Sequence, residues 1–107
     1  MGKGDYLGEF ELVVLITLLH LGEEAYGMTI RRDIEERTGR SVSIGAVYTT
    51  LRRLQGKGYV SAKLGAPSRS RGGRAKKYFT LEAEGQAALQ RSREMFYRLW
   101  KNVPETR

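Results

Sequence analysis

Cysteine is absent from this sequence of 107 residues, which also contains a single histidine and two prolines. The absence of cysteine excludes disulfides, zinc fingers and thiol catalysis, and it fits a reducing cytosol. A long hydrophobic run is also lacking. The longest, at residues 12–21, is interrupted by Thr17 and His20 and is too short to span a bilayer. Acidic residues precede it where a secretory signal would carry positive charge. We therefore expect a cytoplasmic protein that contacts no membrane.

Acidic residues are missing from a long central segment. No Asp or Glu lies between Glu36 and Glu82, whereas eleven cations do. These cations are Arg37, Arg40, Arg52, Arg53, Lys57, Lys63, Arg69, Arg71, Arg74, Lys76 and Lys77. Because the whole chain has a net charge of +7, the residues outside this segment sum to −4. A polyanion would meet one cationic face on a mildly acidic body, which favours a nucleic-acid-binding surface.

The residue types of an enzyme active site are scarce. An enzyme needs a nucleophile with a base, paired carboxylates or metal ligands. This chain has one histidine and no cysteine, and its carboxylates are spread over amphipathic segments. The glycine-rich segment 65–77 lacks the Gly-Lys-Ser/Thr of a phosphate-binding loop, and no helix follows it directly. We therefore expect no catalytic residues, no metal site and no cofactor.

Apolar residues recur at three- and four-residue spacing in three early segments, which predicts helices over residues 9–21, 25–37 and 44–55. Ser43 is a suitable N-cap for the third helix. The first helix is apolar around almost its whole circumference and must be covered on more than one side. Either it lies at the centre of its own domain or a partner subunit covers it, and the sequence leaves both arrangements open.

The pattern then changes to that of a β-hairpin. Residues 60–64 alternate between apolar and polar, and a second short strand with two aromatic residues is predicted at 77–81. The glycine-rich, cationic segment between them forms the tip. Residues 82–101 return to helical spacing. Three helices, a basic hairpin and a trailing helix indicate a mainly α fold with a small β-hairpin (α+β), a winged helix-turn-helix followed by a C-terminal helix.

The third predicted helix has a small or polar face opposite its apolar stripe. The residues of this face are Gly45, Ala46, Thr49, Arg52 and Arg53. Gly45 and Ala46 would let the helix approach the floor of a DNA groove, and Thr49 can bond a base edge or contact a thymine methyl. The two arginines can reach guanine or phosphate. Tyr48 lies at the border of this face, either as a core aromatic or as a phosphate ligand.

The expected hairpin tip adds a second group of cations. These are Arg69, Arg71, Arg74, Lys76 and Lys77. Such side chains can bind phosphates beside or within the minor groove. The alternative is a solvated charged loop, but the repulsion among uncompensated cations would destabilise that loop unless the cations bind an anion.

Four stretches carry a family resemblance: Leu-Gly-Glu-Phe-Glu-Leu from Leu7, Ala-Tyr-Gly from Ala25, Ser-Ile-Gly-Ala-Val-Tyr-Thr-Thr-Leu-Arg-Arg-Leu from Ser43, and Gly-Gly-Arg-Ala-Lys-Lys-Tyr-Phe from Gly72. Together, over residues 7–85, they closely resemble the PadR-like transcriptional regulators. The resemblance implies a dimeric bacterial repressor that binds operator DNA through its third helix and its wing. The positions that it implies for DNA contact are Ser43, Gly45, Ala46, Tyr48, Thr49, Arg52, Gly73, Arg74 and Lys76.

The last predicted helix has a coiled-coil-like seam at three- and four-residue spacing. The seam consists of Leu89, Ser92, Phe96, Leu99 and Val103. The resemblance implies that this helix pairs with the first helix of a partner subunit. The expected dimer interface therefore also includes Phe10, Val14 and Trp100. Some short relatives bind flat aromatic compounds at this interface, which implies a candidate site for a small aromatic effector at Met95, Phe96 and Trp100, with plain dimer core as the alternative.

We therefore expect a sequence-specific transcriptional regulator. It would be a homodimeric repressor that binds double-stranded DNA at a near-palindromic operator. Residues 1–81 would form the DNA-binding domain and residues 82–107 the dimerisation helix of the same compact unit. When bound, the protein would associate with the nucleoid. The alternative is a winged-helix module that binds RNA or a protein partner without operator specificity, although RNA binders usually expose aromatic platforms on a sheet.

Overall fold

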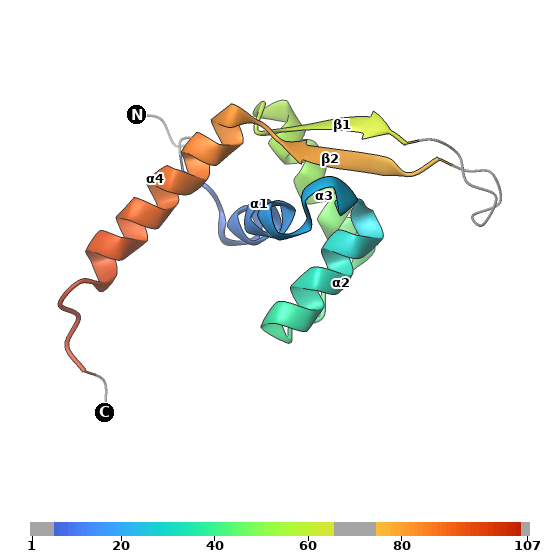
Figure 1. Cartoon of the computed structure of the whole chain (residues 1–107). Coiled ribbons are helices and arrows are strands. Elements are labelled where there is room, and N and C mark those ends of the chain that lie inside the picture. Colours follow the sequence, from blue (N-terminus) through green and yellow to red (C-terminus); the bar gives the residue numbers. More distant parts are fainter. Residues whose placement is uncertain (1–5, 66–74, 106–107) are drawn as a thin grey trace.

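The elements follow the predicted order of three helices, a hairpin and a final helix. A computed structural model describes residues 6–65 and 75–105 of the chain. Its elements, drawn in Figure 1, are α1 (Glu9–Leu21), the 3-10 helix η2 (Gly22–Glu24), α2 (Gly27–Thr38), α3 (Ile44–Gly56), β1 (Val60–Leu64), β2 (Lys77–Leu81) and α4 (Ala83–Trp100). The α+β fold class, a winged helix-turn-helix with a C-terminal helix, is confirmed.

Helix α1 lies at the centre of the molecule, where it contacts α2, α3, β2 and α4. Each of these surrounding elements contributes at least one buried side chain to the core. Complete burial of an aliphatic side chain contributes about 1.5–3 kcal/mol. The core consists of Val14, Leu15, Leu18, Ala25, Ile30, Ile34, Val47, Leu51, Leu54, Val60, Phe79 and Leu89. The domain itself therefore covers part of α1, which was one of the two arrangements that the sequence left open.

The local signals at helix ends explain most of the element bounds. Ser43 caps α3, because its hydroxyl oxygen accepts a hydrogen bond of 3.0 Å from the Ala46 N–H. Gly39 follows α2 with a positive φ of 76°, a conformation that glycine adopts without strain. Helix α2 begins at Gly27, two residues later than predicted, because Tyr26 is extended (φ −132°, ψ 171°) and pairs with the hairpin.

The hairpin is attached to the start of α2. Strands β1 and β2 are antiparallel, with Val60 opposite Leu81 and Leu64 opposite Lys77. The Phe79 N–H donates to the Ala25 carbonyl at 2.8 Å, and Tyr26 forms an isolated bridge with Tyr78. The segment before α2 therefore extends the sheet, and this fixes the base of the wing relative to the helices.

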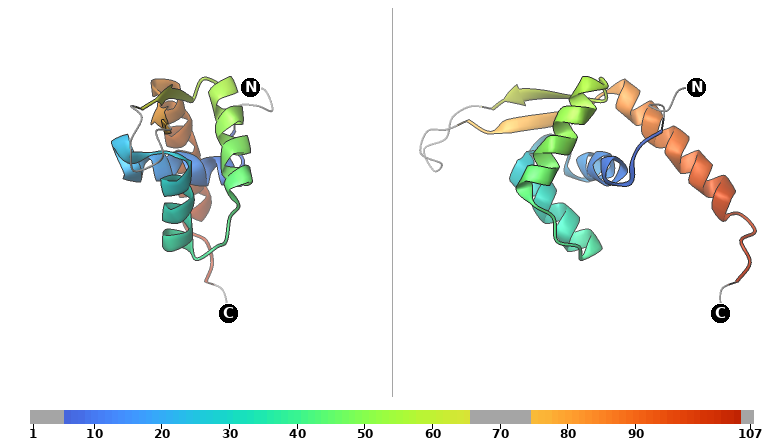
Figure 2. Two further views of the ribbon diagram at one scale, coloured as in Figure 1. Left: turned by 90° about the vertical axis from the view of Figure 1, so that its right-hand side faces the viewer. Right: turned by 180° about the vertical axis from the view of Figure 1, so that it is seen from behind.

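Helix α4 leaves the body on the side opposite the hairpin, as Figures 1 and 2 show. Its direction is set close to its start. The Glu82 N–H donates to the Tyr59 carbonyl at 2.9 Å, and a Cβ atom at Gly85 would overlap the same carbonyl oxygen. Glycine at this position lets the first turn of α4 lie directly against the chain that enters β1.

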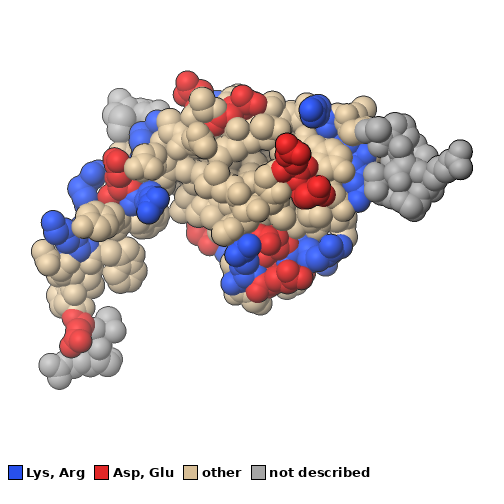
Figure 3. Space-filling view, viewed as in Figure 1, with Lys and Arg blue, Asp and Glu red and all other residues tan. Residues whose placement is uncertain are grey.

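Large apolar side chains stay exposed along α1 and the second half of α4. Ile16 and Leu19 are 42% and 54% exposed, and Trp100 is 69% exposed. Figure 3 shows an uncharged surface over α1, with charged side chains gathered on α2 and along α4. The single chain therefore covers only part of the apolar circumference of α1.

Candidate nucleic-acid interface

Helix α3 presents the face that its sequence pattern predicted. Val47, Leu51 and Leu54 are fully buried in the core. The residues on the opposite side, Gly45, Ala46, Thr49, Arg52 and Arg53, are exposed, as is the cap Ser43. This face carries small residues at its N-terminal end and two cations toward its C-terminal end, so it is narrow where it would enter a groove and charged where it would meet a backbone.

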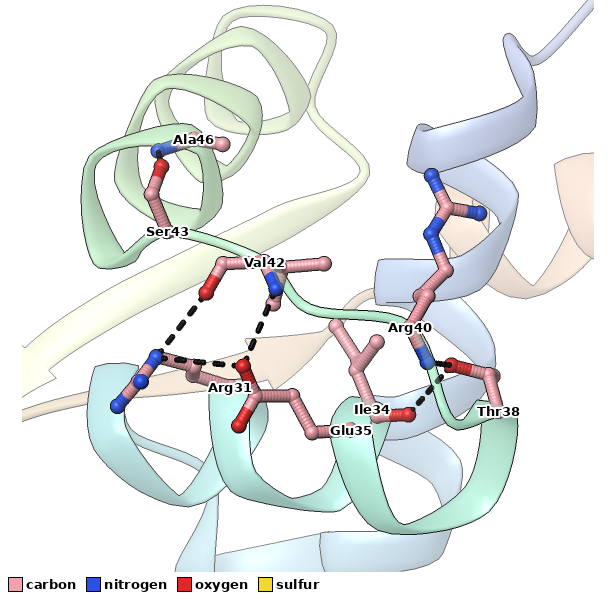
Figure 4. Close-up of polar contacts among 8 residues, drawn as sticks. All are labelled: Arg31, Ile34, Glu35, Thr38, Arg40, Val42, Ser43 and Ala46. Carbon is pink, nitrogen blue, oxygen red and sulfur yellow. Dashed lines mark hydrogen bonds and ion pairs between the residues drawn. The ribbon is translucent and has the colours of Figure 1, made fainter.

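The start of α3 is held in place by two side chains of α2 that sequence reasoning did not identify. Figure 4 shows the turn between the two helices. The Glu35 carboxylate accepts from the Val42 N–H at 3.1 Å, and the Arg31 Nε donates to the Val42 carbonyl at 3.1 Å. Arg31 and Glu35 lie 3.8 Å apart. Both polar groups of the Val42 backbone are satisfied by α2, which fixes the angle at which α3 begins.

Tyr48 packs as a partly buried aromatic, one of the two roles that its sequence left open. Its ring is half-buried, with its centroid 6.4 Å from that of Phe79. A Cβ atom at Gly27 would overlap the Tyr48 hydroxyl, so only glycine at the start of α2 leaves room for it. The ring therefore packs on the core, and the hydroxyl lies against the start of α2.

The base of the wing holds one cation in a defined position. The Lys76 Nζ lies 3.6 Å from the centroid of the Tyr26 ring, and the Tyr78 ring meets Tyr26 edge-on at 5.4 Å. A cation over an aromatic face contributes about 0.5–2 kcal/mol, which favours this position over free rotation. Lys77 is exposed. The other predicted wing residues, Arg69, Arg71, Gly73 and Arg74, lie outside the described residues.

A groove joins α3 to the base of the wing. Its lining residues are Tyr26, Met28, Arg32, Tyr48, Ala75, Lys76 and Lys77. Three of them, Tyr48, Lys76 and Lys77, are predicted DNA-binding residues, and the fold brings them together. Met28 and Arg32 are additions from α2 that sequence reasoning did not identify. Their spacing of four residues, opposite the buried Ile30 and Ile34, was the available signal.

Some cations of the acid-free segment are neutralised in the fold by acidic residues from other parts of the chain. Lys57 pairs with Glu11 at 3.0 Å, Arg40 with Glu9 at 2.6 Å, and Arg37 with Asp33 at 2.9 Å. Each of these acids lies before the segment in the chain. Three of the eleven cations are thus compensated within the fold, whereas Arg52, Arg53, Lys63, Lys76 and Lys77 form no ion pair with the described residues.

Glu11 is the buried acid among these pairs, with an exposed fraction of 6%. Burial raises the pKa of its carboxyl, but hydrogen bonds from the Gly8 N–H and the Lys57 ammonium, with the charges of Lys57 and Arg53, more than offset this. Its pKa therefore lies below the ordinary value for Glu. The Gly8 N–H donates at 2.8 Å, so one carboxylate both caps the N-terminus of α1 and ties it to Lys57, the residue directly after α3.

The predicted dimer residues divide into two groups. Val14, Leu89 and Ser92 are buried within the single chain, so they pack in the core of the protomer itself. Phe96, Leu99, Trp100 and Val103 are exposed and Phe10 is half-buried. Met95, predicted for the effector site, is also half-buried. A groove of ≈ 750 Å³ between α1 and α4 is lined by Leu12, Ile16, Leu19, Ala83, Gln86, Ala87, Leu89, Gln90, Arg93 and Phe96.

Comparison with known proteins agrees with this geometry. A model of the transcriptional regulator PadR-like family matches residues 15–91. The chain is similar to a PadR family transcription regulator from Clostridium difficile, with 21% identity and a TM-score of 0.74 over 88% of this chain and 93% of that chain. No curated protein sequence matches.

Two further solved structures share the fold. A PadR-like transcriptional regulator from Bacillus cereus is 22% identical, with a TM-score of 0.70 over 84% of this chain and 82% of that one. A winged-helix DNA-binding protein from STIV is 16% identical, with a TM-score of 0.71 over 92% and 99%.

Within residues 6–65 and 75–105, no helix combines the length and the apolar character needed to cross a membrane. The exposed face of α3 beside a cationic wing base is the arrangement expected of a DNA-binding winged helix. The family model matches residues 15–91, most of the chain, and this span includes both of these features. The chain therefore belongs to the PadR-like family of transcriptional regulators.

Proposed function

We propose that this PadR-like regulator is a homodimeric, sequence-specific repressor of a near-palindromic operator. The observation that carries the proposal is the exposed face of α3 next to the cationic base of the wing. Ser43, Gly45, Ala46 and Thr49 would enter the major groove, with Arg52 and Arg53 beside them. Tyr48, Lys76 and Lys77 would bind the backbone alongside, and bound protein would occlude the polymerase.

The uncovered apolar surface supports the second half of the proposal. Phe96, Leu99, Trp100 and Val103 expose 41–69% of their area in the single chain. A second copy that lays its α4 against the groove between α1 and α4 would remove these side chains from water, at about 25 cal/mol per Å². Because a two-fold axis uses the same patch on both subunits, one apolar face suffices for a dimer.

A small aromatic effector would bind at the same interface. Trp100 offers an indole face for stacking, Phe96 lines the groove, and Met95 is a flexible side chain beside it. Binding there would change the distance between the two copies of α3, which is how release from the operator would occur. In this division residues 1–81 bind DNA and residues 82–107 hold the dimer together.

The hairpin argues against RNA as the partner. A sheet that binds single-stranded RNA exposes aromatic rings on which bases stack. Here Phe79 is 3% exposed and Tyr78 packs edge-on against Tyr26. The aromatic residues of the described part of the sheet are therefore used inside the fold, which favours double-stranded DNA.

Selection of bound sites from a random DNA pool tests the proposal. We expect enrichment of a near-palindrome whose half-sites lie about 34–36 Å apart, one helical turn. The enriched site should retain binding in excess random DNA and RNA. Recovery of no common sequence, or equal competition by RNA, would contradict an operator-specific regulator and favour a general winged-helix module.

A further inference from the structure

The groove between α2 and the base of the wing contains a cation that the known and predicted contacts do not use. Arg32 is exposed and lines this groove with Tyr26, Tyr48 and Lys76. We propose that the groove binds a phosphate of the DNA backbone, with Arg32 on the side of α2 and Lys76 on the side of the wing. The inference deepens the proposed function and rests on it.

The arginines of α2 have different partners, which singles out Arg32. Arg31 is bound to Val42 and Glu35, and Arg37 is paired with Asp33. Arg32 forms no ion pair or side-chain hydrogen bond with the described residues, although Glu36 lies one turn further along the same helix. The Arg32 side chain is therefore solvent-exposed and lines the groove without a neutralising partner among the described residues. A guanidinium in such a place can form two parallel hydrogen bonds to a phosphate.

Lys76 faces the same groove and is already held in position. Its ammonium group lies on the Tyr26 ring, which is in turn supported by the edge of the Tyr78 ring. A side chain that is ordered before binding loses less conformational freedom when the ligand arrives. Tyr48 lines the same groove, and its side chain carries a hydroxyl that can act as a neutral donor. The lining thus combines cations and a hydroxyl around one space, and no acidic side chain is among the lining residues.

The groove is also in the right place for a DNA backbone. Tyr48 belongs to α3, so a strand of DNA that leaves the exposed face of α3 toward the wing has to pass Tyr48 and Lys76. A phosphate bound there would set how deeply α3 enters the major groove, because backbone contacts fix the register of the protein on the duplex. Arg32 would then act as a positioning contact and would not read the sequence.

The salt dependence of binding tests this inference. Each neutralised phosphate contributes about 0.9 to the slope of log K against log salt concentration. We expect Arg32→Ala to lower this slope on both operator and random duplex DNA, by up to about 0.9 because Lys76 still faces the same phosphate, and Arg32→Lys to keep it close to the value of the unaltered protein. Arg91→Ala removes another exposed arginine, from α4, and is the matched control, with an unchanged slope.

A double-mutant cycle tests whether Arg32 and Lys76 bind together. If both cations hold the same phosphate, the loss in Arg32→Ala/Lys76→Ala differs from the sum of the single losses. Additive losses, or an unchanged slope in Arg32→Ala while the unaltered protein binds duplex DNA with a strong salt dependence, would overturn this site alone. If the unaltered protein binds no duplex DNA, the proposed function fails as well.

Discussion

Thr49 is the uncharged side chain of the exposed α3 face that is best suited to a base edge. Replacement by Ala removes one hydroxyl and one methyl group but no charge. We expect Thr49→Ala to change the base preference at one operator position, with a loss of about 1–3 kcal/mol there. Affinities for a panel of single-base operator variants measure this. Lys77→Ala, at the wing base, should instead weaken all sequences by a similar factor, and an identical profile for both variants would make Thr49 a backbone contact.

Glu11 makes the stability of the protein depend on acid pH. Its pKa is lowered in the folded chain, so its contribution is complete above the unfolded pKa of about 4.3 and is lost as the pH falls through the folded value. We expect Glu11→Gln to lower the free energy of unfolding at pH 7, and the difference from the unaltered protein to shrink below about pH 4. Urea unfolding at pH 7, 5 and 3 measures both.

A control for net charge is available on α4. Glu84→Gln also removes one carboxylate, but from an exposed position with no ion pair among the described residues. Its effect on the free energy of unfolding should be small at every pH. If the two variants show the same pH profile, the hydrogen bonds of Glu11 to Gly8 and Lys57 do not contribute to stability.

At the scale of elements, the turn between α2 and α3 depends on one carboxylate. Glu35→Ala would leave the Val42 N–H without its acceptor and Arg31 without its partner. We expect a loss of about 1–3 kcal/mol in the free energy of unfolding, measured by urea denaturation. Because α3 begins directly after this turn, operator affinity should also fall under conditions where the variant is fully folded. Unchanged affinity with reduced stability would show that the angle of α3 is set by the core alone.

The first half of helix α4 has one buried face, whereas its second half has no buried residue, so the second half can be removed without cutting into the core. Ser92 is 4% exposed, whereas most of the following residues are exposed. A chain that ends after Ser92 keeps its own core and should sediment as a monomer at concentrations where the whole chain sediments as a dimer. A chain that lacks only residues 104–107 is the control. A dimer in both truncated forms would show that the second half of α4 is not needed for the proposed interface.

The elements could be predicted from the sequence because their signals are local. The apolar spacing and the cap at Ser43 gave α3 to within one residue, and the alternation gave β1 at its observed bounds. Contacts between distant segments could not be predicted in this way. The extended Tyr26 depends on pairing with Tyr78, fifty-two residues later, and the burial of Val14 in its own protomer depends on how the other helices surround α1.

The candidate site could likewise be predicted only where its signals are local in the sequence. Residues on one helix face follow from periodicity, so the exposed face of α3 was found. The charges counted along the chain do not show which cations are neutralised by ion pairs. Glu9 and Glu11 belong to α1, far from the acid-free segment in sequence, yet they pair with Arg40 and Lys57. The sequence does not single out Arg32 for the same reason. Arg32 lies outside the acid-free segment, and only the fold places it at the same groove as Lys76.

At the scale of the whole molecule, the two ends of the protomer differ in chemistry. The hairpin and its groove carry cations without partners among the described residues, whereas the far end of α4 carries exposed aromatic and aliphatic side chains. The described chain extends over 55 × 34 × 21 Å, so these surfaces are well separated. In the proposed dimer a partner subunit would cover one end while DNA occupies the other, and the packing of α4 across the two-fold axis would set the distance between the two copies of α3.

This separation predicts a strict dependence on the spacing of half-sites. Five extra base pairs at the centre of the operator turn the half-sites to opposite faces of the duplex, because one helical turn takes about 10–10.5 base pairs. A rigid dimer can then bind only one half-site, and we expect affinity to fall to that of an isolated half-site, as measured by gel shift. Ten extra base pairs return both half-sites to the same face of the duplex but increase the distance between them. Affinity should then recover only if the dimer can change its conformation at the wings and α4. Equal affinity for all three spacings would mean that the two DNA-binding units act independently.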